Sequence, residues 1–191
     1  TETKLGGFGA FFKLNPKVDD LPDSLGVEAM EGVRLLVMGG VKKGGTGCVC
    51  PESTLLKNLL RHIVLQRNEA VVMDMEAGLE HLGRGTAGAV DILLVVVEPG
   101  KRSIDTAREI KRLAGDIGIK RVGTVLNKIR RGEEEELLRE ELKDMEILGY
   151  LPFREAILRA DLENKAPFLL DKESLSMIDE ILQKIQNPKN P

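Results

Sequence analysis

Short aliphatic runs, separated by stretches with the apolar spacing of amphipathic helices, are the feature that most constrains how this chain can fold. Such runs occupy residues 33–38, 70–75, 92–97, 121–126 and 146–151. They are unbroken rather than alternating, which is typical of strands that are buried on both faces of a sheet. We therefore expect an α/β fold, in which helices cover both faces of a mostly parallel sheet.

Helices are predicted over residues 103–114, 133–143 and 174–185, and another is predicted to begin at Pro51. We interpret residues 1–186 as a single domain, with an ordered loop region at 1–32 and the α/β core at 33–186. Residues 187–191 form a flexible tail in this interpretation. Because the chain opens with neither a methionine nor a first strand, we expect a fragment that is truncated at its N-terminus.

Composition and charge exclude several partners. A formal net charge of −3 gives no general attraction to nucleic acid or to anionic membranes. The longest purely apolar run, residues 92–97, is far shorter than the roughly 20 residues that span a bilayer. We expect a cytoplasmic protein with no nucleic-acid or membrane partner.

The glycine-rich stretch 38–52 contains both cysteines, and it lies between a predicted strand and a predicted helix. Residues 43–47, Lys-Gly-Gly-Thr-Gly, resemble the start of a phosphate-binding loop. However, Cys48 stands where the phosphate-contacting lysine belongs, and Val49 where the magnesium-binding hydroxyl belongs. The substitutions argue against a working nucleotide P-loop at this point.

Cys48 and Cys50 instead suit a metal site. Residues two apart in extended backbone face the same side, and a helix N-terminus favours the thiolate form. Sulfur ligands suit zinc, copper(I) or an iron–sulfur cluster, and a plane of four sulfurs accepts nickel(II). A two-fold dimer would bring together four thiolates. The alternatives are a redox pair or two inert buried thiols.

Other polar residues are predicted at the ends of strands. Asp74 lies near the end of the run 70–75 and precedes a loop with glycine, an arrangement that nucleotide hydrolases use to hold magnesium. Asn127 and Lys128 follow the run 121–126, where an amide can pair with adenine. The sequence Leu-Pro-Phe at 151–153 forms a proline–aromatic turn that can cover the adenine ring. Taken singly, each could equally be a turn or capping residue.

Taken together, these residues resemble the CooC-type nickel-insertion ATPases, which mature carbon monoxide dehydrogenase and are MinD-like ATPases of the P-loop class. The match includes Cys-Val-Cys at 48–50, Asp-Met-Glu-Ala-Gly-Leu-Glu at 74–80 and Phe-Phe-Lys-Leu-Asn-Pro-Lys-Val-Asp-Asp at 11–20. The resemblance implies a P-loop NTPase (MinD-like) fold and a homodimer that uses ATP or ADP with Mg²⁺. Its metal would be Ni²⁺ or Zn²⁺, and its client would be apo carbon monoxide dehydrogenase.

The resemblance also implies roles for individual residues. The metal ligands would be Cys48 and Cys50, and the catalytic acids would be Asp74 and Glu76. The residues bordering the nucleotide would be Gly78, Asn127, Lys128, Leu151 and Pro152. The family's P-loop, Lys-Gly-Gly-x-Gly-Lys-Thr, does not occur in these 191 residues. We therefore expect them to bind ATP weakly and not to hydrolyse it.

Two other functions are compatible with the sequence. One is a MinD-like partitioning or positioning ATPase that uses no metal, although the cysteine pair has no role in it. The other is an iron–sulfur carrier, because two cysteines from each chain can ligate a cluster across a dimer. Within the first interpretation, acetyl-CoA synthase is an alternative client.

Overall fold

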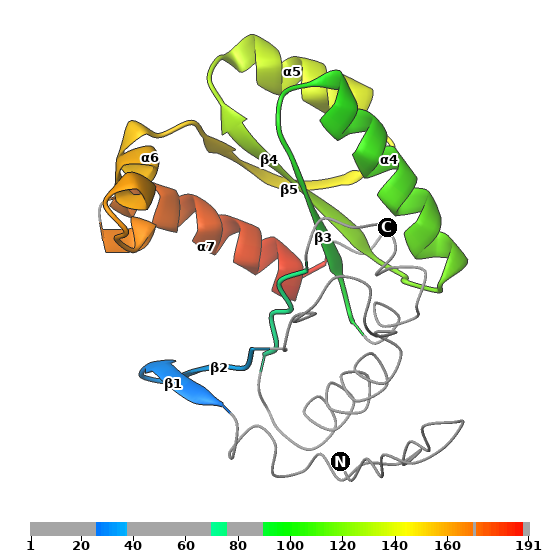
Figure 1. The fold of residues 1–191 in the computed structure, drawn as a ribbon. Coiled ribbons are helices and arrows are strands. Elements are labelled where there is room, and N and C mark those ends of the chain that lie inside the picture. Colours follow the sequence, from blue (N-terminus) through cyan, green and yellow to red (C-terminus); the bar gives the residue numbers. More distant parts are fainter. Residues whose placement is uncertain (1–25, 38–69, 76–89, 170, 189–191) are drawn as a thin grey trace, which may run out of the picture. The chain divides into compact units, whose positions relative to one another are not determined.

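The computed structural model of the protein describes residues 26–37, 70–75, 90–169 and 171–188 (Figure 1). It divides into two compact units, residues 1–89 and 90–191, and each is described by itself. The first contains a short β-hairpin, and the second contains a parallel sheet with helices. The assignment of residues 1–186 to a single domain stays a prediction.

In the first unit, β1 (Val27–Met30) and β2 (Val33–Leu35) form an antiparallel pair. Gly32 has a φ of 76°, the left-handed conformation that glycine adopts readily in a tight turn. Every residue of both strands is exposed. Our prediction of a buried strand at 33–38 was wrong in its burial, and the predicted loop region 1–32 contains a strand. The turn allows the aliphatic run to pair with its immediate neighbour.

Residues 70–75, which we predicted as a strand, have no regular secondary structure. A strand is defined by hydrogen bonds to a neighbour, and within the described residues no strand pairs with this segment. The helix predicted from Pro51 lies outside the described residues.

The second unit contains the predicted parallel sheet, in the order β3 (Leu93–Val97), β4 (Val122–Ile129), β5 (Glu146–Pro152). Parallel neighbours need crossover connections, which α4 (Lys101–Asp116) and α5 (Gly132–Glu141) supply. After β5 come α6 (Glu155–Leu162), the 3₁₀ turn η2 (Pro167–Leu169) and α7 (Lys172–Gln186). The predicted helices are confirmed with shifted ends, whereas α6 was not predicted.

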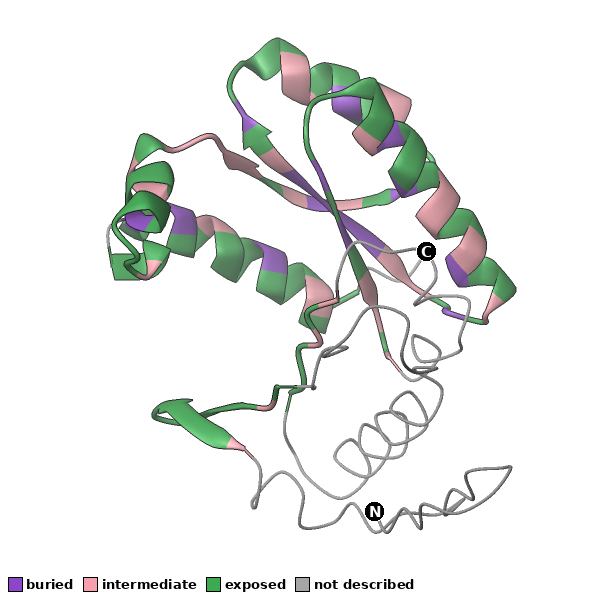
Figure 2. Ribbon diagram, in the orientation of Figure 1, coloured by how far each residue is buried: buried purple, intermediate pink, exposed green. Residues whose placement is uncertain are grey.

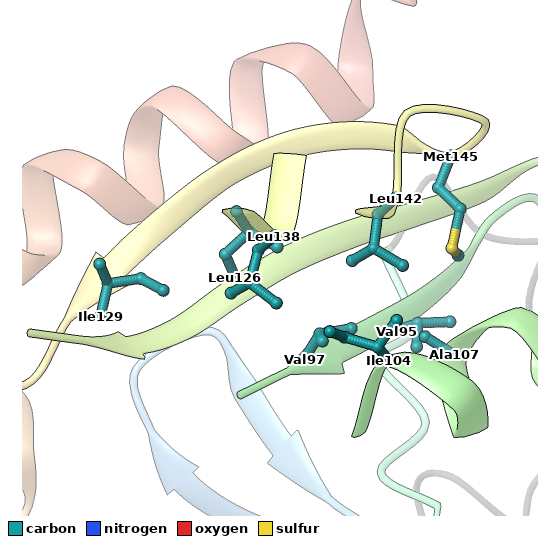
Figure 3. Close-up of a cluster of buried hydrophobic side chains, with 9 residues drawn as sticks. All are labelled: Val95, Val97, Ile104, Ala107, Leu126, Ile129, Leu138, Leu142 and Met145. Carbon is teal, nitrogen blue, oxygen red and sulfur yellow. The ribbon is translucent and has the colours of Figure 1, made fainter. Parts of the chain in front are cut away.

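Helices cover both faces of this sheet, as expected (Figure 1). On one face, side chains of α4 and α5 pack against β3 and β4 in a cluster of nine buried residues (Figure 3). On the other, Ile181 of α7 packs against Val125 of β4 and Leu148 of β5. Buried positions therefore concentrate on the sheet and on the helix sides that face it (Figure 2). Among the described helices, none is long and apolar enough to cross a membrane.

Gly149 sets how closely α7 approaches β5. A Cβ at this position would lie 2.7 Å from Ile181 Cγ1, so Gly149→Ala should destabilise the fold by about 1–3 kcal/mol through overpacking. Gly115 in α4 is the matched control, because a Cβ there meets nothing within 4 Å. The free energy of unfolding of Gly115→Ala should rise by about 0.4–1 kcal/mol, because alanine lowers the conformational entropy of the unfolded chain. Urea unfolding measures both changes, and equal stability of the two variants would contradict this packing.

Arg121 joins the start of β4 to β5 and to the end of α7. Its guanidinium donates to both carboxylate oxygens of Glu146, over 3.0 and 2.7 Å. It also donates to the main-chain carbonyls of Lys184 and Ile185, over 2.8 and 2.7 Å. The last carbonyls of a helix have no partner within the helix, so Arg121 caps α7. Hydrogen bonding from Arg121 also lowers the pKa of Glu146.

This ion pair predicts a pH dependence of stability. Because the pKa of Glu146 is lowered on folding, its contribution is complete above the unfolded value of about 4.3 and is lost as pH falls through the folded value. Wild type should therefore lose more stability than Glu146→Gln between neutral pH and pH of about 3. The difference should be no more than about 1 kcal/mol, because the Glu146 side chain is 42% exposed and water screens the pair. Urea unfolding across this range measures the loss. Glu140→Gln, at an exposed pair with Lys143, is the control. Parallel curves for wild type and Glu146→Gln would refute the prediction.

Candidate functional site

The carboxyl ends of the parallel strands form the candidate site in the second unit. We call these ends the carboxyl edge of the sheet. Ligands of open α/β sheets bind just outside it, because helices cover the two faces of the sheet. Four of the residues predicted to border a nucleotide lie here. They are Asn127 and Lys128 on β4 and Leu151 and Pro152 on β5.

Asn127 and Lys128 lie in a bulge of β4. The ladder pairs Leu126 with Tyr150, and its next pair comes three residues later on β4 but only two residues later on β5. The extra residue on β4 is what defines a bulge. Lys128 has a φ of 57°, which is uncommon for a residue with a side chain. We predicted that the strand ends before Asn127. This was wrong, because after the bulge β4 continues to Ile129.

An ion pair joins the ends of β3 and β4. Lys128 Nζ lies 2.7 Å from Oε1 of Glu98, the residue that follows β3. The backbone N–H of Glu98 in turn donates to Oγ of Ser103, in the first turn of α4, over 3.1 Å. Half-exposed pairs of this kind contribute only about 0–1 kcal/mol to stability. The pair therefore matters mainly because it positions Lys128 and Glu98 against each other.

A second contact joins the ends of β4 and β5. The guanidinium carbon of Arg130 lies 4.2 Å from the centre of the Phe153 ring, a cation–π arrangement. The Phe153 N–H donates to the carbonyl of Ile129 over 2.8 Å, and the Arg130 N–H donates to Oε2 of Glu134 over 2.8 Å. The predicted proline–aromatic turn therefore lies next to the bulge. Arg130 covers one face of the aromatic ring.

Beyond this turn, Arg154 fixes the start of α7. It forms an ion pair with Glu173, and its Nε lies 3.9 Å from Oδ2 of Asp171. Asp171 caps α7 by accepting hydrogen bonds from the N–H and the hydroxyl of Ser174, over 3.3 and 2.5 Å. These hydrogen bonds, opposed by desolvation, lower the pKa of Asp171. The end of β5 and the last helix are thereby held together.

The other predicted site residues belong to the first unit, residues 1–89. Cys48, Cys50, Glu76 and Gly78 lie outside the described residues. Asp74 is described and exposed, in a segment of the first unit that has no regular secondary structure. Among the described residues, no group of three or more histidine, cysteine or acidic side chains forms a metal site.

Sequence reasoning did not select Glu98, Ser103 or Arg130. Glu98 and the Pro-Gly pair that follows it could have been recognised as the end of a strand. Arg130 carried no signal, because its contact with Phe153 depends on the pairing of β4 with β5. The carboxyl ends of the strands together offer the amide of Asn127, the apolar turn at 151–153 and the ion pair of Lys128 with Glu98, which has no net charge. This set of groups suits binding of a polar aromatic molecule.

Comparison with known proteins finds relatives by sequence and neighbours by structure. The chain is 46% identical over 193 residues to an uncharacterized ATP-binding protein of Methanocaldococcus jannaschii, covering 100% of this chain and 74% of that protein. It is 47% identical over 153 residues to the carbon monoxide dehydrogenase accessory protein CooC of Rhodospirillum rubrum, covering 80% of this chain and 58% of that protein. No protein-family model matches the chain.

One structural neighbour is the MinD cell division protein of Aquifex aeolicus. The superposition has a TM-score of 0.57 at 18% sequence identity, and it covers 73% of this chain and 62% of that one. At this identity, the likeness concerns the fold alone. It agrees with the expected α/β fold of the P-loop NTPases.

Proposed function

The chain belongs to the CooC-type family of MinD-like ATPases, and on this premise we propose that it acts in an ATP-dependent, nickel-inserting metallochaperone for carbon monoxide dehydrogenase. The observation that carries the proposal is the 47% identity to the accessory protein CooC over 80% of this chain. The chain spans 58% of that relative, so the activity and client of the whole protein are themselves part of the proposal. Its setting would be the cytoplasm.

The metal-binding part of the proposal rests on Cys48 and Cys50. Two thiolates from one chain are half of a four-sulfur site, and a homodimer would supply the other half. Such a site suits Ni²⁺ or Zn²⁺, which would be the cargo delivered to the apo enzyme. Both cysteines lie outside the described residues, so the support is the sequence motif and the family.

The nucleotide part rests on the edge of the second unit. The amide of Asn127 carries both donors and an acceptor, which match the edge of adenine. The bulge takes this residue out of the regular ladder. Leu151 and Pro152 supply an apolar wall on β5, and the ion pair of Lys128 with Glu98 adds polar groups without a net charge. We infer that ATP or ADP binds with its base at this edge.

The catalytic part of the proposal assigns Mg²⁺ and the γ-phosphate to Asp74 and Glu76, with Gly78 in the same loop. A carboxylate can hold the water shell of Mg²⁺ and respond to loss of the γ-phosphate. Hydrolysis also requires a lysine-containing phosphate loop, and these 191 residues contain no such motif. Nucleotide binding by this chain is therefore weak in our proposal, and turnover needs residues beyond it.

Metal binding is testable by dialysis against Ni²⁺ or Zn²⁺ followed by elemental analysis. We expect about one metal ion per two chains, since four sulfur ligands complete one site. A variant with both Cys48→Ser and Cys50→Ser should lose the metal. The control is His81→Ala, which changes a histidine outside the proposed ligand set and should retain the metal. Unchanged metal content in the double variant would overturn the metal proposal. A brown species after anaerobic purification would instead favour the iron–sulfur carrier.

Nucleotide binding is testable by NMR titration of the chain with ATP. Asn127→Ala should weaken binding about tenfold, because it removes one or two hydrogen bonds to the base. Asn187→Ala, at the exposed end of α7, is the control and should bind as wild type does. Unaltered affinity of Asn127→Ala would contradict the assigned base position. Robust ATP hydrolysis by the wild-type chain would contradict the expected need for further residues.

A further inference from the structure

Glu98 lies beside the proposed base site on the neighbouring strand. Val97, the last residue of β3, pairs with Leu126 of β4, so Glu98 and Asn127 each follow a residue of the same pair. Leu151 and Pro152 border the other side of Asn127, on β5. A base that binds at the ends of β4 and β5 would therefore have Glu98 on the opposite side of β4, at the end of β3.

The position of Glu98 is set by two contacts. Its N–H donates to Ser103 Oγ over 3.1 Å, and its Oε1 lies 2.7 Å from Lys128 Nζ. A carboxylate has two oxygens and can accept about four hydrogen bonds. The ion pair with Lys128 engages Oε1, and 48% of the Glu98 side chain is exposed. The carboxylate is therefore held in place with acceptor capacity to spare.

We propose that Glu98 Oε2 accepts a hydrogen bond from a ribose hydroxyl of the bound nucleotide while Lys128 holds the carboxylate in place. The inference rests on the proposed nucleotide function. A ribose carries two neutral hydroxyl donors, and an acidic residue after a parallel strand takes this role in dinucleotide-binding folds. The Lys128 charge offsets that of Glu98, so the carboxylate does not repel the phosphates of the same ligand.

A simpler role for the same ion pair is that it only braces the bulge. The two roles differ in one measurable respect. A brace would affect ribonucleotides and deoxyribonucleotides equally, because it acts through the shape of the edge. A direct contact would affect only the ligand that carries the hydroxyl. Comparing the ligands across variants therefore separates the contact from any change in the fold.

The experiment is an NMR titration of the chain with ATP, 2′-deoxy-ATP and 3′-deoxy-ATP. Wild type should prefer ATP over one of the deoxy analogues by about tenfold, the effect of one hydrogen bond to a charged group. In Glu98→Ala this ratio should fall to about one. Glu98→Gln, which keeps an acceptor oxygen, should retain part of the preference. Glu140→Ala, at an exposed pair on α5, should leave the ratio unchanged.

Three results would overturn the inference while ATP binding remains intact. The first is equal affinity of wild type for ATP and both analogues. The second is a preference that persists in Glu98→Ala. The third is an equal loss of affinity for all three ligands in that variant, which would identify a brace. Failure of wild type to bind ATP at all would instead overturn the proposed nucleotide site, and this inference with it.

Discussion

The close packing of β4 between two layers of helices is the constraint on which the rest of the second unit depends. Leu126 is fully buried against side chains of α4 and α5, whereas Val125 belongs to the cluster that includes Ile181 of α7. Successive residues of one strand thus fill two separate apolar clusters. Charged groups have no place along such a strand except at its ends. The polar residue buried in its middle, Thr124, donates its hydroxyl hydrogen to Met145 Sδ over 3.9 Å. The candidate site lies at the carboxyl edge for this reason.

The sheet and its helices could be predicted because their signals are local. The run 92–97 is long enough to span a core strand and has no polar interruption, and 121–126 is also long enough, with Arg121 and Thr124 as its polar residues. A parallel arrangement follows once helical patterns separate such runs. Asn127 and Lys128 were selected because they follow one of these runs directly. They lie near the carboxyl end of β4, the central strand of the sheet.

Features that depend on pairing between distant segments could not be predicted. The bulge exists only in relation to β5, and the contact between Lys128 and Glu98 joins residues from different strands. The hairpin of β1 and β2 uses an aliphatic run that has the composition of a buried strand. Helix α6 has only eight residues, too few for a clear apolar period. The cysteine motif lies outside the described residues, so its geometry stays a prediction.

The bulge allows a charged residue to lie next to the last residue of a buried strand. Side chains alternate along a regular strand, so Lys128 would follow Leu126 into the apolar cluster under α4 and α5. The extra residue shifts this alternation, and Ile129 takes the core position beside Leu126 instead. Placing Lys128 in the left-handed conformation costs about 1–2 kcal/mol.

The residues around the bulge also connect the ends of the three strands. Lys128 reaches the end of β3 through Glu98, and Arg130 reaches the end of β5 through Phe153, so the two basic residues on either side of Ile129 join all three strand ends. Side chains that are already held in place lose little conformational entropy when a ligand arrives. An edge built in this way is organised for binding before any ligand is present. The strain at Lys128 and the burial of Ile129 are therefore two consequences of a single inserted residue.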